Sequence, residues 1–309
     1  MIATITLNPC IDRTFMLPSV SLGNLNLAKK SRIDIGGKGI NVAVALKQLG
    51  VPVTCGGICF EGESEKLYEE LKILDIPFNF VIAPGDIRTN IKIMDLNKNE
   101  MTEINSLGEP VCNDILDKFL DDLKKSGETC EIVVLGGRLP NGAGTDFYKK
   151  CIEVLSEYPV KVIVDSDGEP LKQAVKAKPY LIKPNAYELG MLFDEEIKTP
   201  EKAISLSKKI IDSGVNIVCC SLGEHGAVIV DNKNAWYSPA LNIVPKGLQG
   251  AGDSMAAGIC KAITENLPPS EMLRYGTAAA AASIIREGTL MCRKPDFDLF
   301  LPDVKILPI

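Results

Sequence analysis

The sequence predicts an α/β fold in which a parallel sheet is covered by helices on both faces. Three observations support this prediction. Short apolar segments alternate with helical patterns along most of the 309 residues, as in chains built from strand–helix–strand units. The apolar segments are rich in Val, Ile and Leu, as expected of strands that are buried on both faces. Two other segments alternate apolar and polar residues and indicate a separate, one-sided sheet.

The first strand–helix units are the clearest. Ile2–Leu7 predicts a buried strand, and Val42–Leu49 predicts a helix that ends at Gly50. Val53–Ile58 predicts a second strand, which is followed by a helix over Glu63–Leu74. The repeated order of strand and helix favours parallel pairing of the strands.

The alternation continues in the second half of the chain. The predicted strands are Ile132–Leu135, Val160–Asp165, Leu181–Lys183 and Ile217–Ser221. Helical patterns lie among and after these strands, over Phe147–Leu155, Pro200–Ser213 and Pro269–Ile285. Met255–Cys260 predicts one more helix, whose small residues allow close packing against neighbours.

Two segments interrupt this rhythm, at about residues 13–35 and 87–107. Their alternating residues, as in Asn90–Asp95, predict strands with one buried face. We expect them to form a small β-sheet lid inserted into one domain that spans residues 1–309, because no repeat or linker divides the chain.

Composition and charge exclude several classes of protein. An apolar content of 46% and a charged content of 24% are typical of a soluble globular protein. The net charge of −6 argues against a nucleic-acid surface, although one basic cleft could still bind a small anion. The longest apolar run, around Ala278–Ile285, is far shorter than the roughly 20 residues of a membrane-spanning helix. The amino-terminal residues read as a strand rather than a signal peptide.

The cysteines and the single histidine do not suggest a metal site. The 10 cysteines include no Cys-x-x-Cys pair, and several fall in apolar runs. Such thiols are typical of small buried residues in a reducing cytoplasm, where we expect the protein to be located. His225 lies in the predicted turn Gly223–Gly226, where an exposed side chain is expected.

The most informative motif is Gly250-Ala251-Gly252-Asp253-Ser254, directly before the small-residue helix. Backbone N–H groups at such a helix start, aided by the helix dipole, can bind an anion. Asp253 would lie beside that anion and could act as a base for an attacking hydroxyl, as phosphoryl transfer requires. By itself the motif favours an ordinary helix cap, and only the rest of the chain favours the anion site.

Other polar residues follow predicted strands, where ligand sites of open α/β sheets lie. Asn8 to Asp12 follow the first strand, and Gly36-Gly37-Lys38-Gly39 precedes the helix that contains Asn41. The glycines of this loop would allow a ligand to approach the backbone closely, and its lysine could reach an anion. The alternative is a flexible glycine loop with a solvated lysine. The loop lacks the pattern of a Walker motif.

Two further groups allow both a functional and a structural interpretation. Arg88, Asn90 and Lys92 share one face of a strand, which could bind a phosphate or form the solvent face of the lid. Asn185 and Glu188 meet on one helical turn, where their oxygens suit hydrated Mg²⁺. The same pair could instead form a capping box.

These motifs, in this order, resemble those of the ribokinase-like (PfkB) family of carbohydrate kinases, over residues 1 to about 300. The patterns Thr6-Leu7-Asn8-Pro9-x-x-Asp12, Gly36-Gly37-Lys38-Gly39-x-Asn41 and Arg88-x-Asn90-x-Lys92 are similar to those of the branch that acts on sugar phosphates. That branch includes 1-phosphofructokinase and tagatose-6-phosphate kinase. The resemblance implies a parallel sheet flanked by helices, with a β lid that often forms a dimer interface.

The resemblance also implies roles for individual residues. Asp253 would be the catalytic base, and Gly250, Ala251 and Gly252 the anion hole. Sugar hydroxyls would be held by Asp12, Gly37, Lys38 and Asn41, and the substrate's own phosphate would lie near Lys38, Arg88 and Lys92, with Asn90 on the same face. ATP would be bordered by Lys183, Ser221, Gly223 and Gly226, and Mg²⁺ would be organised through water by Asn185 and Glu188.

The chain departs from the family pattern in two places. Gly247-Leu248-Gln249 replaces a hydroxyl-rich stretch before the Gly-Ala-Gly-Asp motif, which bears on ATP affinity and potassium activation. Arg138 replaces a serine in Leu135-Gly136-Gly137-Arg138-Leu139-Pro140, where it could contact the substrate phosphate or form a surface ion pair.

The function implied is ATP- and Mg²⁺-dependent phosphorylation of a ketohexose monophosphate, with fructose 1-phosphate giving fructose 1,6-bisphosphate. Tagatose 6-phosphate is the alternative acceptor, and a weakly active or inactive sugar-phosphate-binding protein is the alternative class. The expected partners are these small molecules and a second copy of the chain bound through the lid sheet, without nucleic acid or membrane.

Overall fold

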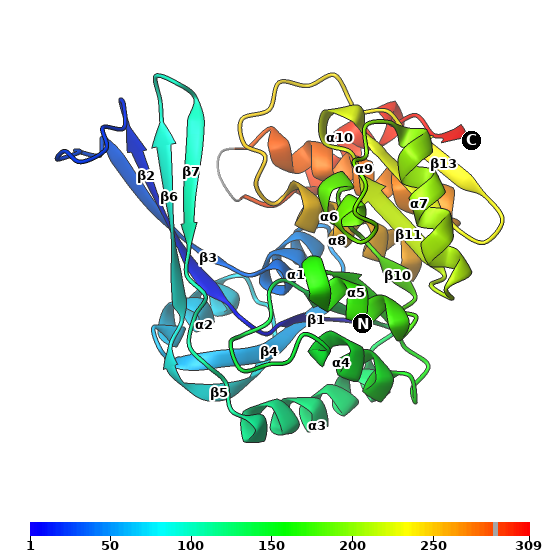
Figure 1. Ribbon diagram of the computed structural model, residues 1–309, viewed down its shortest axis with the longest axis horizontal. Helices are drawn as coiled ribbons and strands as arrows, with labels where there is room; N and C mark the ends of the chain where they lie inside the picture. Colours follow the sequence, from blue (N-terminus) through cyan, green and yellow to red (C-terminus); the bar gives the residue numbers. More distant parts are fainter. Residues whose placement is uncertain (287–289) are drawn as a thin grey trace.

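The computed structural model of the protein describes residues 1–286 and 290–309. Its main body is a large sheet with helices on both faces, and a small sheet rises from one side of this body (Figure 1). This arrangement confirms the predicted α/β fold class.

Ten strands of the described residues form the large sheet. From one edge to the other they are β14 (Leu307–Pro308), β13 (Ala235–Ser238), β12 (Ala227–Val230), β11 (Ile217–Ser221), β10 (Leu181–Ile182), β9 (Lys161–Asp165), β8 (Ile132–Gly136), β1 (Ile2–Thr6), β4 (Val53–Gly62) and β5 (Phe78–Asp86). Pairing is parallel from β5 to β11 and antiparallel from β11 to β14. The parallel register places Thr6, Gly136 and Asp165 side by side at the carboxyl edge of the sheet.

The helices form two groups of neighbours, and each group packs against the large sheet. One group contains α1 (Lys38–Gln48), α8 (Ala251–Thr264), α9 (Pro269–Ile284) and α10 (Lys294–Phe300). The other contains α3 (Asn113–Thr129), α4 (Phe147–Leu155), α5 (Gly168–Lys176), α6 (Ala186–Met191) and α7 (Pro200–Asp212). The short α2 (Ser64–Ile73) contacts β4 and β3, while η1 (Gly223–His225) and η2 (Leu301–Asp303) are single 3-10 turns.

Four strands of the two inserted segments form the small sheet, in the order β3 (Lys30–Gly36), β2 (Cys10–Leu17), β6 (Arg88–Asp95) and β7 (Glu100–Asn105). β2 follows the carboxyl end of β1 after only a few residues, so the small sheet begins at the edge where ligand sites of such folds lie.

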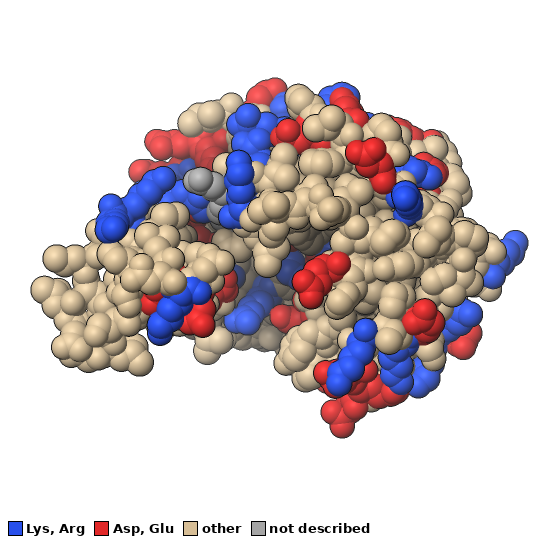
Figure 2. Space-filling model, turned by 90° about the horizontal axis from the view of Figure 1, so that it is seen from above, with Lys and Arg blue, Asp and Glu red and all other residues tan. Residues whose placement is uncertain are grey.

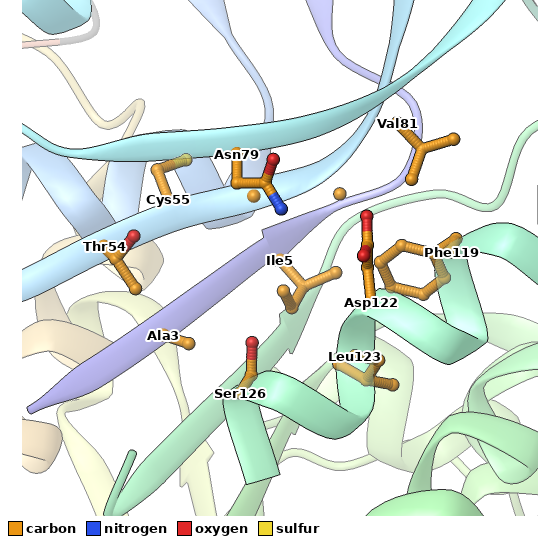
Figure 3. A pocket seen from close by; sticks show the side chains of 12 residues that line it. Ala3, Ile5, Thr54, Cys55, Asn79, Val81, Phe119, Asp122, Leu123 and Ser126 are labelled. Carbon is orange, nitrogen blue, oxygen red and sulfur yellow. The ribbon is translucent and has the colours of Figure 1, made fainter. Parts of the chain in front are cut away.

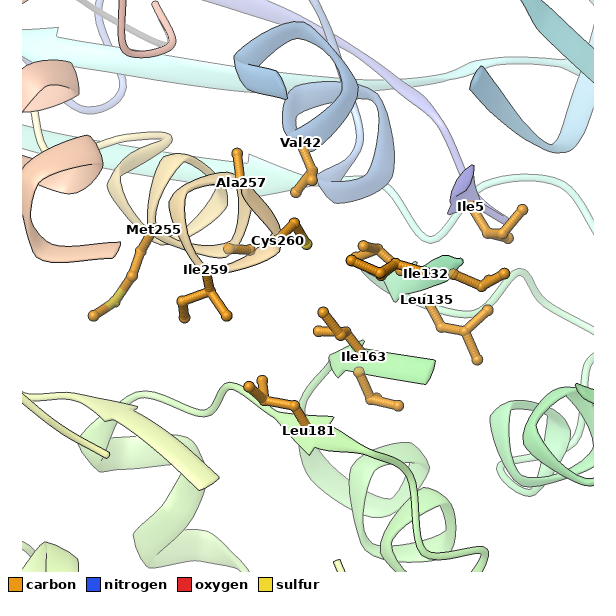
Figure 4. Close-up of a cluster of buried hydrophobic side chains, with 14 of the residues drawn as sticks. Ile5, Val42, Ile132, Leu135, Ile163, Leu181, Met255, Ala257, Ile259 and Cys260 are labelled. Atoms are coloured by element: carbon orange, nitrogen blue, oxygen red, sulfur yellow. The ribbon is translucent and has the colours of Figure 1, made fainter. Parts of the chain in front are cut away.

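A continuous apolar core lies between the helices and the large sheet. Figure 4 shows side chains of α1 and α8 facing those of β8, β9 and β10. Helix α8 also packs closely on α9, since a Cβ at Gly258 would lie 2.4 Å from the carbonyl oxygen of Tyr275. The predicted close packing of the small-residue helix is therefore confirmed.

A small cavity of about 50 Å³ lies between α3 and the sheet, beside β1, β4 and β5 (Figure 3). A water molecule occupies about 30 Å³ in the liquid, so this space fits one or two waters. It is too small for a sugar phosphate.

Several predicted elements have different bounds in the structure. Helix α1 begins at Lys38, earlier than the predicted Val42, so Lys38 and Gly39 belong to its first turn and not to a preceding loop. The predicted bounds of α4, Phe147–Leu155, are confirmed. None of the helices in the described part of the chain combines the length and apolar character needed to cross a bilayer.

Candidate active site

The amino-terminus of α8 provides backbone hydrogen-bond donors that have no partner within the helix. Gly250 is the N-cap and has a φ of 78°, a left-handed conformation that glycine adopts without steric cost. The N–H of Ser254 donates to the carbonyl of Gly250 at 2.8 Å and makes the first bond of the helix. The N–H groups before it have no partner within the helix and lie at the positive end of its dipole. An anion can bind there.

Asp253 lies in the first turn of α8 and is only 8% exposed. Its Oδ2 accepts a hydrogen bond from Nδ2 of Asn41 at 2.7 Å. Burial raises the pKa of the Asp253 carboxyl, and the nearby charge of Asp165 raises it further; Lys38 and the bond from Asn41 act in the opposite direction. A carboxylate with a raised pKa is a stronger proton acceptor than an ordinary one.

A cleft of about 290 Å³ opens between the small sheet and the main body. Seen from above, the surface is hollowed at this place, and basic and acidic side chains are visible inside (Figure 2). The volume is near the lower end of the range for small-molecule sites. Ten of the predicted site residues line the cleft: Asp12, Gly37, Lys38, Asn41, Arg88, Asn90, Lys92, Arg138, Gly250 and Asp253.

The small sheet contributes a buried polar cluster to this cleft. Asp12 of β2 accepts hydrogen bonds from Nδ2 of Asn90 at 2.8 Å and from Nζ of Lys92 at 2.7 Å. The register pairs Asp12 with Asn90, which places these side chains on one face. Asn90 and Lys92 are each 6% exposed. The alternative that they form a solvent face is therefore wrong.

Arg88, Arg138 and Asn8 all line the cleft. Arg88 donates through Nε to the carbonyl of Asn8 at 3.3 Å, and Nδ2 of Asn8 donates to the carbonyl of Leu139 at 3.2 Å. Leu139 follows Arg138, which is exposed and lines the cleft. Neither Arg88 nor Arg138 forms an ion pair with another residue of the described chain, so the surface ion pair considered for Arg138 is not present. Both guanidinium groups can bind an anion.

A buried ion-pair network lies behind the cleft at the carboxyl end of β9. Oδ1 of Asp165 accepts a hydrogen bond from Nζ of Lys38 at 2.7 Å, and its Oδ2 lies 3.0 Å from Nζ of Lys183. Burial opposes the charge of each group. The two lysines nevertheless hold the pKa of Asp165 below its usual value, and Asp165 in turn raises the pKa of both lysines. All three groups are therefore charged at neutral pH.

Lys183 also lies near the α8 amino-terminus. A Cβ at Gly252 would be 3.4 Å from Nζ of Lys183. Of the residues predicted to border ATP, Lys183 therefore lies beside the anion site of α8. Ser221 pairs with Asn185 in a β-bridge, and Gly223 and Gly226 form the turn between β11 and β12.

Asn185 and Glu188 form a capping box at the start of α6. Oδ1 of Asn185 accepts from the N–H of Glu188 at 2.8 Å, and Oε2 of Glu188 accepts from the N–H of Asn185 at 2.9 Å. The other carboxylate oxygen of Glu188 lies 3.7 Å from Nζ of Lys38. The structural interpretation is therefore confirmed.

This capping box does not rule out a hydrated Mg²⁺ ion. Among the described residues, no group of three or more His, Cys, Asp or Glu side chains could form a metal cage. Mg²⁺ commonly keeps several waters and is held by one or two carboxylates together with substrate phosphates. Free lone pairs on the oxygens of Asn185 and Glu188 fit that mode of binding.

Several residues of the site are not among those predicted from the sequence, namely Thr6, Glu103, Asn105, Asp165, Ser166 and Asp167. Thr6, Asp165, Ser166 and Asp167 end or follow strands of the parallel sheet, so the carboxyl-end rule could have found them. Glu103 and Asn105 lie on β7, which has no such signal.

The cysteines and His225 remain outside this chemistry, with one exception. All described cysteines are free, and all except Cys112 are buried, as predicted. His225 is exposed in the turn before β12. Cys10 lines the cleft, but burial, reinforced by the charge of Asp12, raises the pKa of its thiol to about 12. It is therefore a neutral thiol at physiological pH.

Comparison with known proteins identifies the family. The model of the pfkB family of carbohydrate kinases matches residues 5–296. The chain belongs to this family. It is therefore a phosphotransferase with an alcohol acceptor, and ATP is its phosphoryl donor.

Named relatives extend over the full chain. The kinase is 33% identical to a 1-phosphofructokinase of Bacillus subtilis, with 99% of each chain covered. It is 31% identical to a 1-phosphofructokinase of Borreliella burgdorferi over 99% of this chain and 98% of the relative. The crystal structure of phosphofructokinase-2 from Escherichia coli in complex with potassium has a TM-score of 0.91 and 28% identity, with 98% of each chain covered. These similarities support a sugar-phosphate kinase with a ribokinase-like fold.

Proposed function

We propose that the protein transfers the γ-phosphoryl group of ATP to the C6 hydroxyl of fructose 1-phosphate, which gives fructose 1,6-bisphosphate. The observation that carries this proposal is the composition of one cleft, which has a helix amino-terminus and a buried carboxylate at one side. At another side it has two arginines without acidic partners in the described chain. This arrangement suits a substrate that has a reacting hydroxyl and a fixed phosphate.

In the proposed reaction, Asp253 accepts the proton of the sugar hydroxyl while the sugar oxygen forms its bond to the γ-phosphorus. The bond between the γ-phosphorus and the β–γ bridging oxygen breaks, and ADP leaves with the electron pair. The N–H groups of Ala251 and Gly252 stabilise the charge on the phosphoryl oxygens. Lys183 and Lys38 add positive charge behind this site, and Asn41 orients the carboxylate of Asp253.

The residues proposed to border ATP are Lys183, Ser221, Gly223 and Gly226. Asn185 and Glu188 would hold Mg²⁺ through water, and the ion would neutralise charge on the nucleotide phosphates. On the acceptor side, Asp12, Gly37, Lys38, Asn41 and Asn90 would contact sugar hydroxyls. Since Lys92 is already paired with Asp12, its role would be to orient that carboxylate, and the substrate phosphate would bind to Arg88 and Arg138.

A coupled ADP-release assay tests this proposal directly. We expect kcat/KM to be highest for fructose 1-phosphate and to fall by several orders of magnitude for fructose, because each charge-assisted contact contributes about 1.5–3 kcal/mol. The Arg138→Ser variant should raise KM for the sugar phosphate about tenfold and leave KM for ATP unchanged.

The same assay decides between the acceptors. A preference for tagatose 6-phosphate or fructose 6-phosphate would show that the site binds a phosphate on C6 of the sugar and not one on C1. Equal efficiency with fructose and fructose 1-phosphate would contradict the phosphate site, and saturable binding without ADP release would favour an inactive binding protein.

We further propose that the small sheet forms a homodimer interface. The face of the sheet opposite the cleft exposes Ile33 and Ile104, and the β2–β3 connection exposes Leu22, Leu25 and Leu27. Exposed apolar patches of this kind mark interaction surfaces, and a second copy of the same face is an equally apolar partner. A tetrameric inhibited form is known for phosphofructokinase-2 from Escherichia coli.

Sedimentation velocity at micromolar concentration should therefore give the mass of a dimer. The Ile33→Asp variant should be monomeric because a buried carboxylate is costly in an apolar interface. A wild-type monomer would exclude this interface.

A further inference from the structure

Gln249 joins the main body to the small sheet across the cleft. Its Nε2 donates a hydrogen bond to Oε1 of Glu103 at 2.9 Å and lies 3.1 Å from Sδ of Met101. Met101 and Glu103 are two residues apart on β7 and therefore share one face of the strand. The register pairs Glu103 with Lys92, so this is the face that lines the cleft.

The bond from Gln249 reaches a different part of the small sheet from the bond between Arg88 and Asn8. Arg88 and Asn8 bond near the base of the sheet, where its strands leave the main body. The bond from Gln249 instead reaches the strand β7, whose residues are all exposed. Gln249 and Glu103 are 146 residues apart in sequence. Loss of this contact would remove the side-chain hydrogen bond from Gln249 that holds β7 to the main body.

Gln249 also directly precedes Gly250, the N-cap of α8. Gln249 therefore connects β7, through one peptide bond, to the residue at which the anion site of α8 begins. A hydrogen bond at the surface is weak enough to open and close in every catalytic cycle. Gln249 and Glu103 both line the cleft, so the bond spans it when it is formed.

We propose that Gln249 is a positioning residue that holds the small sheet closed over the bound sugar phosphate and couples this closure to the anion site of α8. The inference rests on the proposed function. It assigns a role to the segment Gly247–Gln249, where the chain departs from the pattern of its family. The hydroxyl groups missing from that segment are replaced here by an amide donor that reaches the small sheet.

The Gln249→Glu variant gives the sharpest test because it keeps the size of the side chain and replaces the donor with a second carboxylate facing Glu103. We expect KM for fructose 1-phosphate to rise about tenfold, with KM for ATP nearly unchanged. A larger share of the ATP consumed should appear as inorganic phosphate, since water gains access to an open cleft. Amide hydrogen exchange on β7 should become faster.

Two further variants distinguish the loss of this hydrogen bond from a general loss of stability or structure. The double variant Gln249→Glu with Glu103→Gln exchanges the donor and the acceptor, so it should restore KM, the low hydrolysis of ATP and slow exchange on β7. Glu100→Ala is the matched control, because Glu100 is exposed on the same strand but points to the face opposite Glu103. It should behave as the wild type.

Unchanged KM and unchanged exchange on β7 in Gln249→Glu would overturn the proposal, as would a double variant that is no better than the single one. The hydrogen-exchange measurement on the free protein does not depend on turnover. If the wild type phosphorylated none of the sugar phosphates, the proposed function would fail, and exchange on β7 would still decide whether Gln249 holds the small sheet.

Discussion

Replacing Asp253 with asparagine should lower kcat by about 10²–10⁴-fold, the usual effect of losing a general base. The substitution keeps the size of the side chain and its ability to accept a bond from Asn41, but it removes the proton acceptor. KM for the sugar phosphate should therefore change little. The measurement is steady-state ADP release with both substrates varied.

Asp114→Asn is a matched control, because Asp114 also lies in the first turn of a helix but is exposed on α3. It should have wild-type kinetics. If Asp253→Asn kept more than about a third of wild-type turnover, well outside the range for a base, the assignment of Asp253 would be wrong.

The pH dependence of kcat/KM in the wild type should also reflect the ionisation of Asp253. Only the ionised carboxylate accepts a proton, and burial raises the pKa of Asp253. The acid limb of kcat/KM should thus lie at a higher pH than an ordinary carboxyl pKa of about 4 would give.

Replacing Asp165 with asparagine should produce the largest loss of stability. Asp165 is 1% exposed and is the shared partner of Lys38 and Lys183. Its loss removes the ion-pair partner of Lys183 and leaves Lys38 with only the more distant Glu188, 3.7 Å away, among the ion pairs of the described residues. Breaking a buried pair in this way costs about 3–5 kcal/mol. The midpoint of thermal unfolding should fall by roughly 5–10 °C.

The pH dependence of stability gives a second readout for Asp165. Its pKa is lowered in the folded state, so the stability that it contributes is present above the unfolded pKa and is lost as the pH falls through the folded pKa. The variant should lack this acid-dependent component. Asp121→Asn is the control, since Asp121 forms an exposed ion pair with Lys124 and its loss should change the unfolding midpoint little. An unchanged midpoint in Asp165→Asn would show that the network does not stabilise the fold.

Local sequence signals were sufficient to predict the fold class and many of the residues on the two sides of the cleft. Near-continuous apolar strands predicted the parallel sheet, and the glycine-flanked start of α8 predicted the position of Asp253. The alternation around Asn90 and Lys92 predicted strands, but only the structure shows that the polar face is the buried one.

Other elements were missed because their local signals are weak or conflicting. β5 contains Pro84 and Gly85, and α5 begins with Gly168 and Pro170, which are residues typical of turns. In α3, by contrast, buried residues such as Leu116, Phe119 and Leu123 do have helical spacing. That helix could have been predicted.

Contacts between distant segments could not be read from the sequence. Lys38 and Asp165 are 127 residues apart, and neither residue type identifies its partner. Gln249 appeared in the sequence only as a departure from the family pattern, and its bond to Glu103 depends on how the small sheet folds over the main body.

The central claim is that this cleft transfers a phosphoryl group from ATP to the hydroxyl of a sugar phosphate. Phosphorus-31 NMR of the wild-type protein with fructose 1-phosphate and MgATP tests it most directly. We predict that ADP and fructose 1,6-bisphosphate accumulate in equal amounts while little inorganic phosphate appears. Consumption of ATP with inorganic phosphate as the product, and with fructose 1-phosphate unchanged, would contradict the claim.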